Sequence, residues 1–151
     1  MRRVPSWIAG LAGAAVMVFG TVGAYGQYNY STPKAAAGGL ETEVKTALTH
    51  AGFAQNYDSL KEVTLHLHHV LNCLVGPKDR MFDASAGNPC QGQGNGILAD
   101  IQGGMGKDPQ YYEAAWAART ADEAIKANDL QQAKSGAHVI SLILTDLQKM
   151  K

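Results

Sequence analysis

The sequence predicts an all-α protein, an antiparallel up-and-down four-helix bundle with one long loop that a disulfide pins to it. From residue 40 onward, apolar residues recur at steps of three and four, which is the spacing of one face of a helix. No segment shows the apolar and polar alternation between turn residues that a half-buried strand requires. Four helical segments with mostly short links favour a bundle.

The first 26 residues are typical of a secretory signal peptide. Two arginines follow Met1, and a mostly apolar run over residues 7–24 ends in small residues. We expect cleavage after Ala24 or Gly26, then a flexible leader over residues 27–39 and a bundle domain over residues 40–151. The alternative is an uncleaved membrane anchor, because about 18 apolar residues just span a bilayer.

Charge and cysteine content indicate a periplasmic or secreted protein without a nucleic-acid partner. The chain has 13 Lys and Arg against 13 Asp and Glu, and cleavage would leave it near −2. Nucleic-acid binding needs a basic face, so this balance excludes it, and after cleavage we expect no membrane association. In an oxidising compartment the two cysteines, Cys73 and Cys90, favour a disulfide, which stabilises such a loop by about 3 kcal/mol.

The first two helices have clear apolar faces. Leu40, Val44, Ala47, Leu48 and Ala51 predict the first helix, and we expect Gly52 to end it. Either Asp58 or Ser59 caps the second helix, with Glu62 three residues after Ser59 as a capping box, and the helix stops before Gly76-Pro77.

A long polar loop and two further helices complete the domain. Residues 78–96 are rich in Gly, Asn, Asp and Gln, so they form the loop, and a short helical turn follows at residue 97. Asp108 and Pro109 open the third helix, which carries a stripe of alanines for close packing. Asp129, with Gln132 three residues later, opens the fourth.

The histidine-rich second helix predicts a metal site. His66, His69 and Cys73 project from one flank of the apolar face, whereas His68 lies on the other side. Imidazole suits copper, zinc and nickel, and the Irving–Williams order favours copper. We therefore expect one such ion at His66 and His69, with His138 of the fourth helix as a further candidate ligand.

His50, at the end of the first predicted helix, is left out of this site. In an antiparallel hairpin that turns after Gly52, His50 should face residues near Leu60 rather than His66. No enzymatic activity is expected, because no third orienting group and no Gly-rich oxyanion turn accompany His69 and Cys73.

Two other functions stay open on the sequence alone. The protein is then either a disulfide-stabilised interaction module, in which the loop over residues 78–96 contacts a protein partner and the histidines are incidental, or a bundle that holds haem noncovalently between histidines of two helices. Covalent haem attachment and nucleotide binding are excluded, because the chain has neither a Cys-x-x-Cys-His motif nor a phosphate loop.

Overall fold

The computed structural model describes residues 39–101, 105 and 108–150. The predicted signal peptide and the leader up to residue 38 lie outside these residues. Within the described part of the chain every regular element is helical and no strand occurs, so the all-α class is confirmed.

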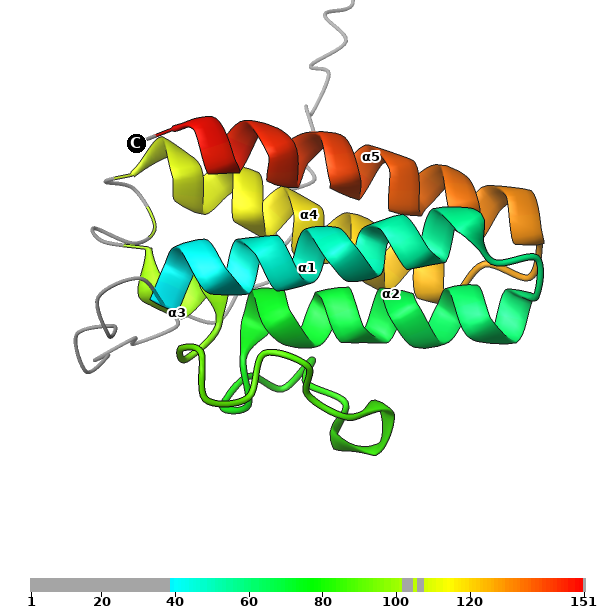
Figure 1. Cartoon of the computed structure of the whole chain (residues 1–151), viewed down its shortest axis with the longest axis horizontal. Coiled ribbons are helices and arrows are strands. Elements are labelled where there is room, and N and C mark those ends of the chain that lie inside the picture. The colour runs from blue at the N-terminus through cyan, green and yellow to red at the C-terminus, as the bar shows by residue number, and fades with distance from the viewer. Residues whose placement is uncertain (1–38, 102–104, 106–107, 151) are drawn as a thin grey trace, which may run out of the picture.

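Five α-helices and one short 3-10 helix follow one another along the described chain. They are α1 (Gly39–Asn56), α2 (Leu60–Val75), the 3-10 helix η1 (Ala84–Ala86), α3 (Ile97–Asp100), α4 (Pro109–Ile125) and α5 (Leu130–Lys149). The four long helices lie side by side, and the segment between α2 and α3 folds back along the outside of α2 (Figure 1). The fold is therefore helical and bundle-like.

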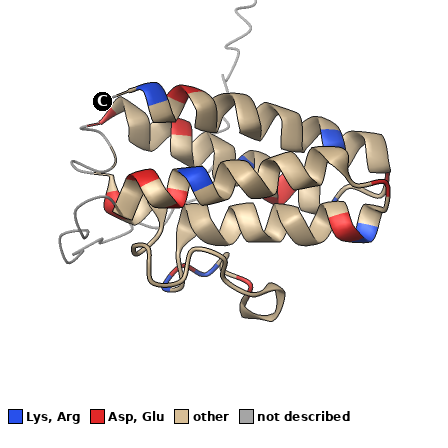
Figure 2. Cartoon of the chain, in the orientation of Figure 1, with Lys and Arg blue, Asp and Glu red and all other residues tan. Residues whose placement is uncertain are grey.

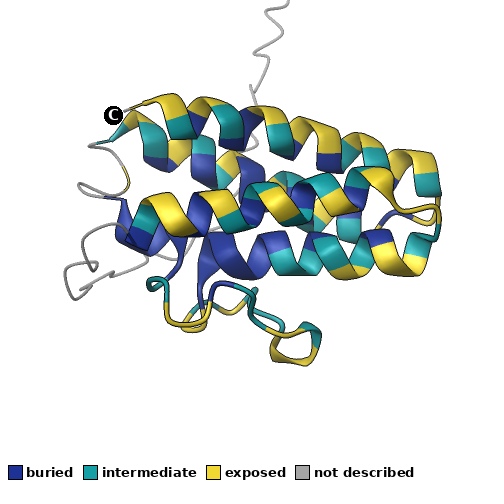
Figure 3. Cartoon of the chain, in the orientation of Figure 1, coloured by how far each residue is buried: buried dark blue, intermediate teal, exposed yellow. Residues whose placement is uncertain are grey.

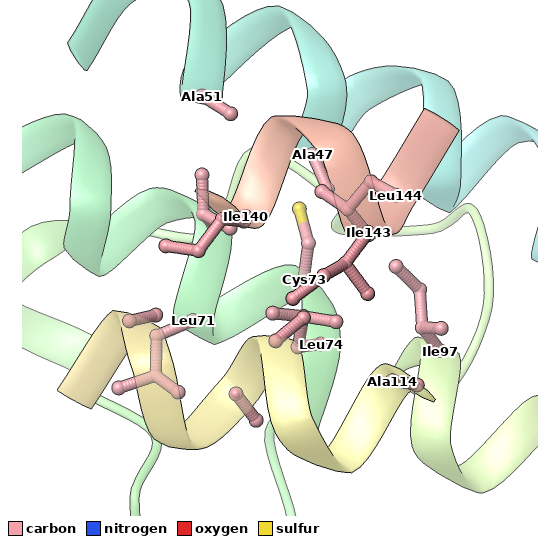
Figure 4. Packing of buried hydrophobic residues seen from close by; sticks show 14 of the residues in the cluster. Ala47, Ala51, Leu71, Cys73, Leu74, Ile97, Ala114, Ile140, Ile143 and Leu144 are labelled. Carbon is pink, nitrogen blue, oxygen red and sulfur yellow. The ribbon is translucent and has the colours of Figure 1, made fainter. Parts of the chain in front are cut away.

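The long helices share one core. α1 packs against α2 and α5, and α4 packs against the same two helices. Each long helix buries one stripe and exposes another (Figure 3). Aliphatic side chains from α2, α3 and α5 meet in the interior, where Figure 4 shows Leu74, Ile97, Ile140 and Leu144, all fully buried. Each such side chain contributes about 1.5–3 kcal/mol by leaving water.

Small residues let α4 and α5 approach closely. The predicted alanine stripe of α4 is buried at Ala114, Ala117, Ala118 and Ala121. On α5, a Cβ added at Gly136 would lie 2.4 Å from the Cβ of Ala124. Any larger residue at Gly136 would therefore push the two helices apart.

Most predicted helix ends are confirmed. The side chain of Asp108 accepts a hydrogen bond from the backbone N–H of Gln110, and that of Asp129 accepts one from Gln132. Ser59 is the N-cap of α2, but its side chain makes no capping hydrogen bond, so the expected capping box with Glu62 does not form.

The predicted end of the first helix is wrong. α1 runs through Gly52 and continues to Asn56. A glycine inside a helix costs about 1 kcal/mol relative to alanine, and tertiary packing offsets this cost here, because Ala51 and Ala54 on either side of Gly52 are fully buried. The additional turn of helix decides how α1 and α2 face each other.

The described surface carries both signs of charge. Acidic and basic residues are scattered over the helices, and neither sign forms a continuous face in the view of Figure 2. None of the helices in the described ranges has the length and apolar content to cross a membrane.

Candidate metal centre

Three histidine side chains from α1 and α2 meet on one side of this helix pair. The Nδ1 atom of His50 lies 3.0 Å from Nδ1 of His66 and 3.2 Å from Nδ1 of His69. One ligand atom from each residue lies within 4.8 Å of the other two, and all three residues are half-buried. These distances allow the three imidazoles, named here the histidine triad, to hold one metal ion.

The length of α1 brings the triad together. Only three residues, 57–59, connect α1 to α2, and the two helices run in opposite directions (Figure 1). His50 lies eight residues before Asp58, at the centre of this turn, and His66 lies eight residues after it. The two therefore face each other, and His69, three residues further along α2, lies on the same side of that helix.

The exclusion of His50 from the site is therefore wrong. A helix that ended at Gly52 would move the centre of the turn toward the N-terminus and would pair His50 with Leu60. Ala54 continues the spacing of Ala47 and Ala51, and all three are fully buried. This continuation of the apolar face indicates a longer helix. The sequence-based prediction instead took Gly52 as the end of the helix.

A carbonyl group outside the triad orients His69. The Nε2–H of His69 donates a hydrogen bond to the backbone oxygen of Ala86 at 2.7 Å. In the neutral ring this leaves the Nδ1 lone pair directed at the triad. Histidines that bind metals commonly donate their second ring N–H to such a carbonyl, which sets the tautomer and the orientation of the ring.

The three neutral rings do not carry enough N–H groups to make a full hydrogen bond at each of the two short Nδ1–Nδ1 contacts. Because His69 carries its proton on Nε2, a proton on Nδ1 of His50 must serve both His66 and His69. It can do so only as a shared and weakened hydrogen bond, since a neutral imidazole has one N–H. A cation between the three nitrogens would satisfy all their lone pairs together.

Asn72 holds the loop segment that presents Ala86. Its side chain is fully buried and donates to the carbonyl oxygens of Asp83 and Gly87, both at 2.7 Å, and it accepts from the N–H of Asp83 at 2.9 Å. These hydrogen bonds hold the residues on both sides of η1 against α2. Gly87 leaves η1 with a φ of 88°, a conformation that glycine adopts without strain.

The predicted disulfide between Cys73 and Cys90 is confirmed. The two Cα atoms are 5.3 Å apart, and both cysteines are buried in the core. The bond ties the loop to α2 directly beside Asn72. It also removes Cys73 from the list of thiolate ligands, so the candidate centre is built from imidazoles alone.

Burial keeps two of the triad histidines uncharged. Desolvation, and next the neighbouring His69 and His66, lower the pKa of His50 to about 4. Desolvation and His69 also lower the pKa of His66, against an opposing effect of Glu62. Neutral imidazoles are the form that binds metals, so these two rings are ready to ligate near pH 7.

The remaining histidines lie away from the triad. His138, predicted as a further ligand, lies on α5 with its Nδ1 3.1 Å from Oε1 of Gln55, outside the triad. His68 lies on the other side of α2, where its Nδ1 is 3.3 Å from a carboxylate oxygen of Asp83. The structure thus brings His66 and His69 together with His50 and places His138 elsewhere.

A buried acidic pair at the other end of the loop escaped the sequence analysis. Glu43 of α1 is 1% exposed and accepts a hydrogen bond from the N–H of Gly96, while Asp100 accepts two from Asn95. Burial raises the pKa of Glu43 to about 8, helped by Asp100 and opposed by the Gly96 N–H. Gly94 packs so closely that an added Cβ would lie 2.2 Å from Oδ2 of Asp100.

The fold and the site define a helical, disulfide-containing protein with a candidate tri-histidine metal centre. Comparison of the chain with protein-family models, with curated proteins and with solved structures gave no match.

Proposed function

We propose that this protein binds one divalent transition-metal ion through the Nδ1 atoms of His50, His66 and His69. The observation that supports this proposal is the closeness of the three Nδ1 atoms. The Nδ1 atom of His50 lies 3.0 Å from that of His66 and 3.2 Å from that of His69. Two nitrogens bound to a tetrahedral zinc at about 2.0–2.1 Å lie roughly 3.3–3.4 Å apart. A small opening of the triad therefore fits an ion.

The donor set favours copper, zinc or nickel. Imidazole nitrogen suits these ions, and the Irving–Williams order places copper highest among them. Two supports act outside the ligand set: the Ala86 carbonyl that orients His69, and the disulfide that anchors the loop carrying it. Such partners raise metal affinity because they limit the freedom of the ligands before binding.

The proposed setting is the periplasm or the medium, with a non-enzymatic role in holding the ion. A disulfide is typical of oxidising compartments, and the first 26 residues have the pattern of a cleaved signal. The mass of the protein recovered from the exporting host tests cleavage near Ala24 to Gly26. A full-length chain that partitions with membranes would refute it.

We assign the long helices to an antiparallel up-and-down four-helix bundle. The packing of α1 and α4 against both α2 and α5 supports this assignment. In such a bundle, ligand sites are built from side chains on facing helices, as the triad is from α1 and α2.

The two alternative functions fit the geometry less well. Haem held between histidines of two helices needs one histidine on each face of the porphyrin, and nitrogens 3.0 Å apart leave no space for the ring between them. An interaction module would leave the histidines without a role, yet the loop over residues 78–96 supplies the carbonyl that orients His69.

Calorimetric titration with copper and with zinc tests the proposal. The parent should bind one ion, and His50→Ala and His69→Ala should each weaken binding by at least about a hundredfold, because even partners of a ligand cost 10–100-fold. His68→Ala and His138→Ala are matched controls that should bind as the parent does. Equal binding by the parent and the His50→Ala variant would refute the triad as the site.

A further inference from the structure

The ligands of the proposed site leave the charge of the ion uncompensated. Imidazoles bind metals in their neutral form, so a divalent ion on His50, His66 and His69 would keep its two positive charges. All three residues are half-buried, and a charge that is partly removed from water is costly unless a counter-charge accompanies it. The site therefore favours an anion beside the metal.

The described part of the chain supplies no anionic donor to the triad. The group of atoms within 4.8 Å contains three histidines and no carboxylate. Cys73, one turn beyond His69, is bonded to Cys90 and has no thiolate. The nearby ring of Tyr57 stacks on His66 with an interplanar angle of 14°, so it covers the face of the imidazole, whereas the Nδ1 lone pair lies in the plane of that ring.

Three donors on one side of an ion also leave coordination space. The two Nδ1 contacts of His50, at 3.0 and 3.2 Å, are close to two edges of a tetrahedral coordination shell. Metal sites with three protein ligands keep a fourth position for water or another small ligand. Charge and geometry thus point to the same kind of occupant.

We infer that the metal ion held by the histidine triad takes a small exogenous anion as its fourth ligand. The inference rests on the proposed metal-binding function, and it names the ligand class as small anions with an oxygen or nitrogen donor, with hydroxide as the member that water itself supplies.

Glu62 is the competing source of the same chemistry. It is exposed on α2, four residues before His66, and its charge acts on that histidine. It is not a member of the triad group, but a different rotamer would bring its carboxylate closer to the metal. The test must therefore separate an external anion from this side chain.

The probe is azide added to the full chain loaded with copper(II). One copper per protein is first verified by calorimetry, and azide is then titrated while the absorption spectrum is recorded. We expect an azide-to-copper charge-transfer band that saturates at one azide per copper. The Glu62→Gln variant should bind azide with an affinity within about threefold of the parent, and His68→Ala is the matched control for adventitious surface sites.

The outcomes test the metal site and the anion site separately. Stoichiometric copper without any azide band would overturn the anion site and leave the metal site standing. A band that appears only in Glu62→Gln would also overturn it, because Glu62 would then be the fourth ligand. A parent protein that binds no copper would overturn both proposals together.

Discussion

His50 and His66 face each other from neighbouring helices with their Nδ1 atoms 3.0 Å apart, although 16 positions separate them in the sequence. Their meeting depends on the length of α1 and on the three-residue turn to α2. The consequences of this contact for acidity, stability and metal binding can each be measured.

Metal affinity should persist to lower pH than that of an exposed histidine pair. The pKa of His50 is lowered to about 4 and that of His66 is also lowered, so protons compete with the metal for these two nitrogens at lower pH than they do at an exposed histidine. Zinc titrations between pH 7 and pH 4 measure this. A loss of binding already centred at pH 6.5 would contradict the buried triad.

Without metal, the same two histidines should make the fold less stable in acid. Their pKa values are lower in the folded chain than in the unfolded chain, so the unfolded chain binds more protons. Stability is therefore lost as the pH falls from about 6.5 toward about 4. A His50→Gln variant should show a shallower loss in urea unfolding across this range, and an unchanged slope would argue against a buried neutral ring.

Replacing Asn72 should loosen the site from outside the ligand set. Asn72→Ala removes three hydrogen bonds that grip η1, so we expect about 2–4 kcal/mol of lost stability and roughly tenfold weaker metal binding. Nitrogen NMR of the metal-free protein should show the Nε2–H tautomer of His69 in the parent and a mixture in the variant. Asn88→Ala is the matched control.

Asn88 lies in the same loop, where its side chain accepts a hydrogen bond from the N–H of Cys90. Its substitution should change stability without changing the His69 tautomer. If Asn72→Ala keeps both the tautomer and the affinity of the parent, the loop carbonyl has no part in orienting the ligand.

Glu43 should give the fold a stability that declines as the pH rises. Its pKa increases from 4.5 to about 8 on folding, so the folded chain holds the proton longer, and stability falls between about pH 4.5 and pH 8. The difference between the parent and Glu43→Gln in urea unfolding isolates this slope from that of the histidines. Parallel pH profiles would contradict a protonated Glu43.

Much of the fold was predictable because local chemistry marks it. The steps of three and four, together with Asp108 and Asp129 as caps, located α4 and α5, and two cysteines in a chain expected to be exported predicted the disulfide. Gly52 misled the prediction, because its cost in a helix is local, whereas the burial of Ala51 and Ala54 that offsets it is tertiary.

Only part of the candidate site, His66 and His69, could be predicted from the sequence. His66 and His69 share one helix, so their proximity follows from helical geometry. The contribution of His50 depends on the register between two helices, and a change of one helical turn in α1 removes it. The carbonyl of Ala86 carries no sequence signal at all, because every residue has one.

The bond between Cys73 and Cys90 also sets an order of events in the life of the chain. Before it forms, Cys73 presents a thiol one helical turn from His69, and a soft metal ion would find a mixed sulfur and nitrogen ligand set there. Afterwards both sulfurs are buried and the loop lies beside the histidines. If the chain binds a metal as proposed, an all-imidazole centre therefore requires that the disulfide forms before the ion binds.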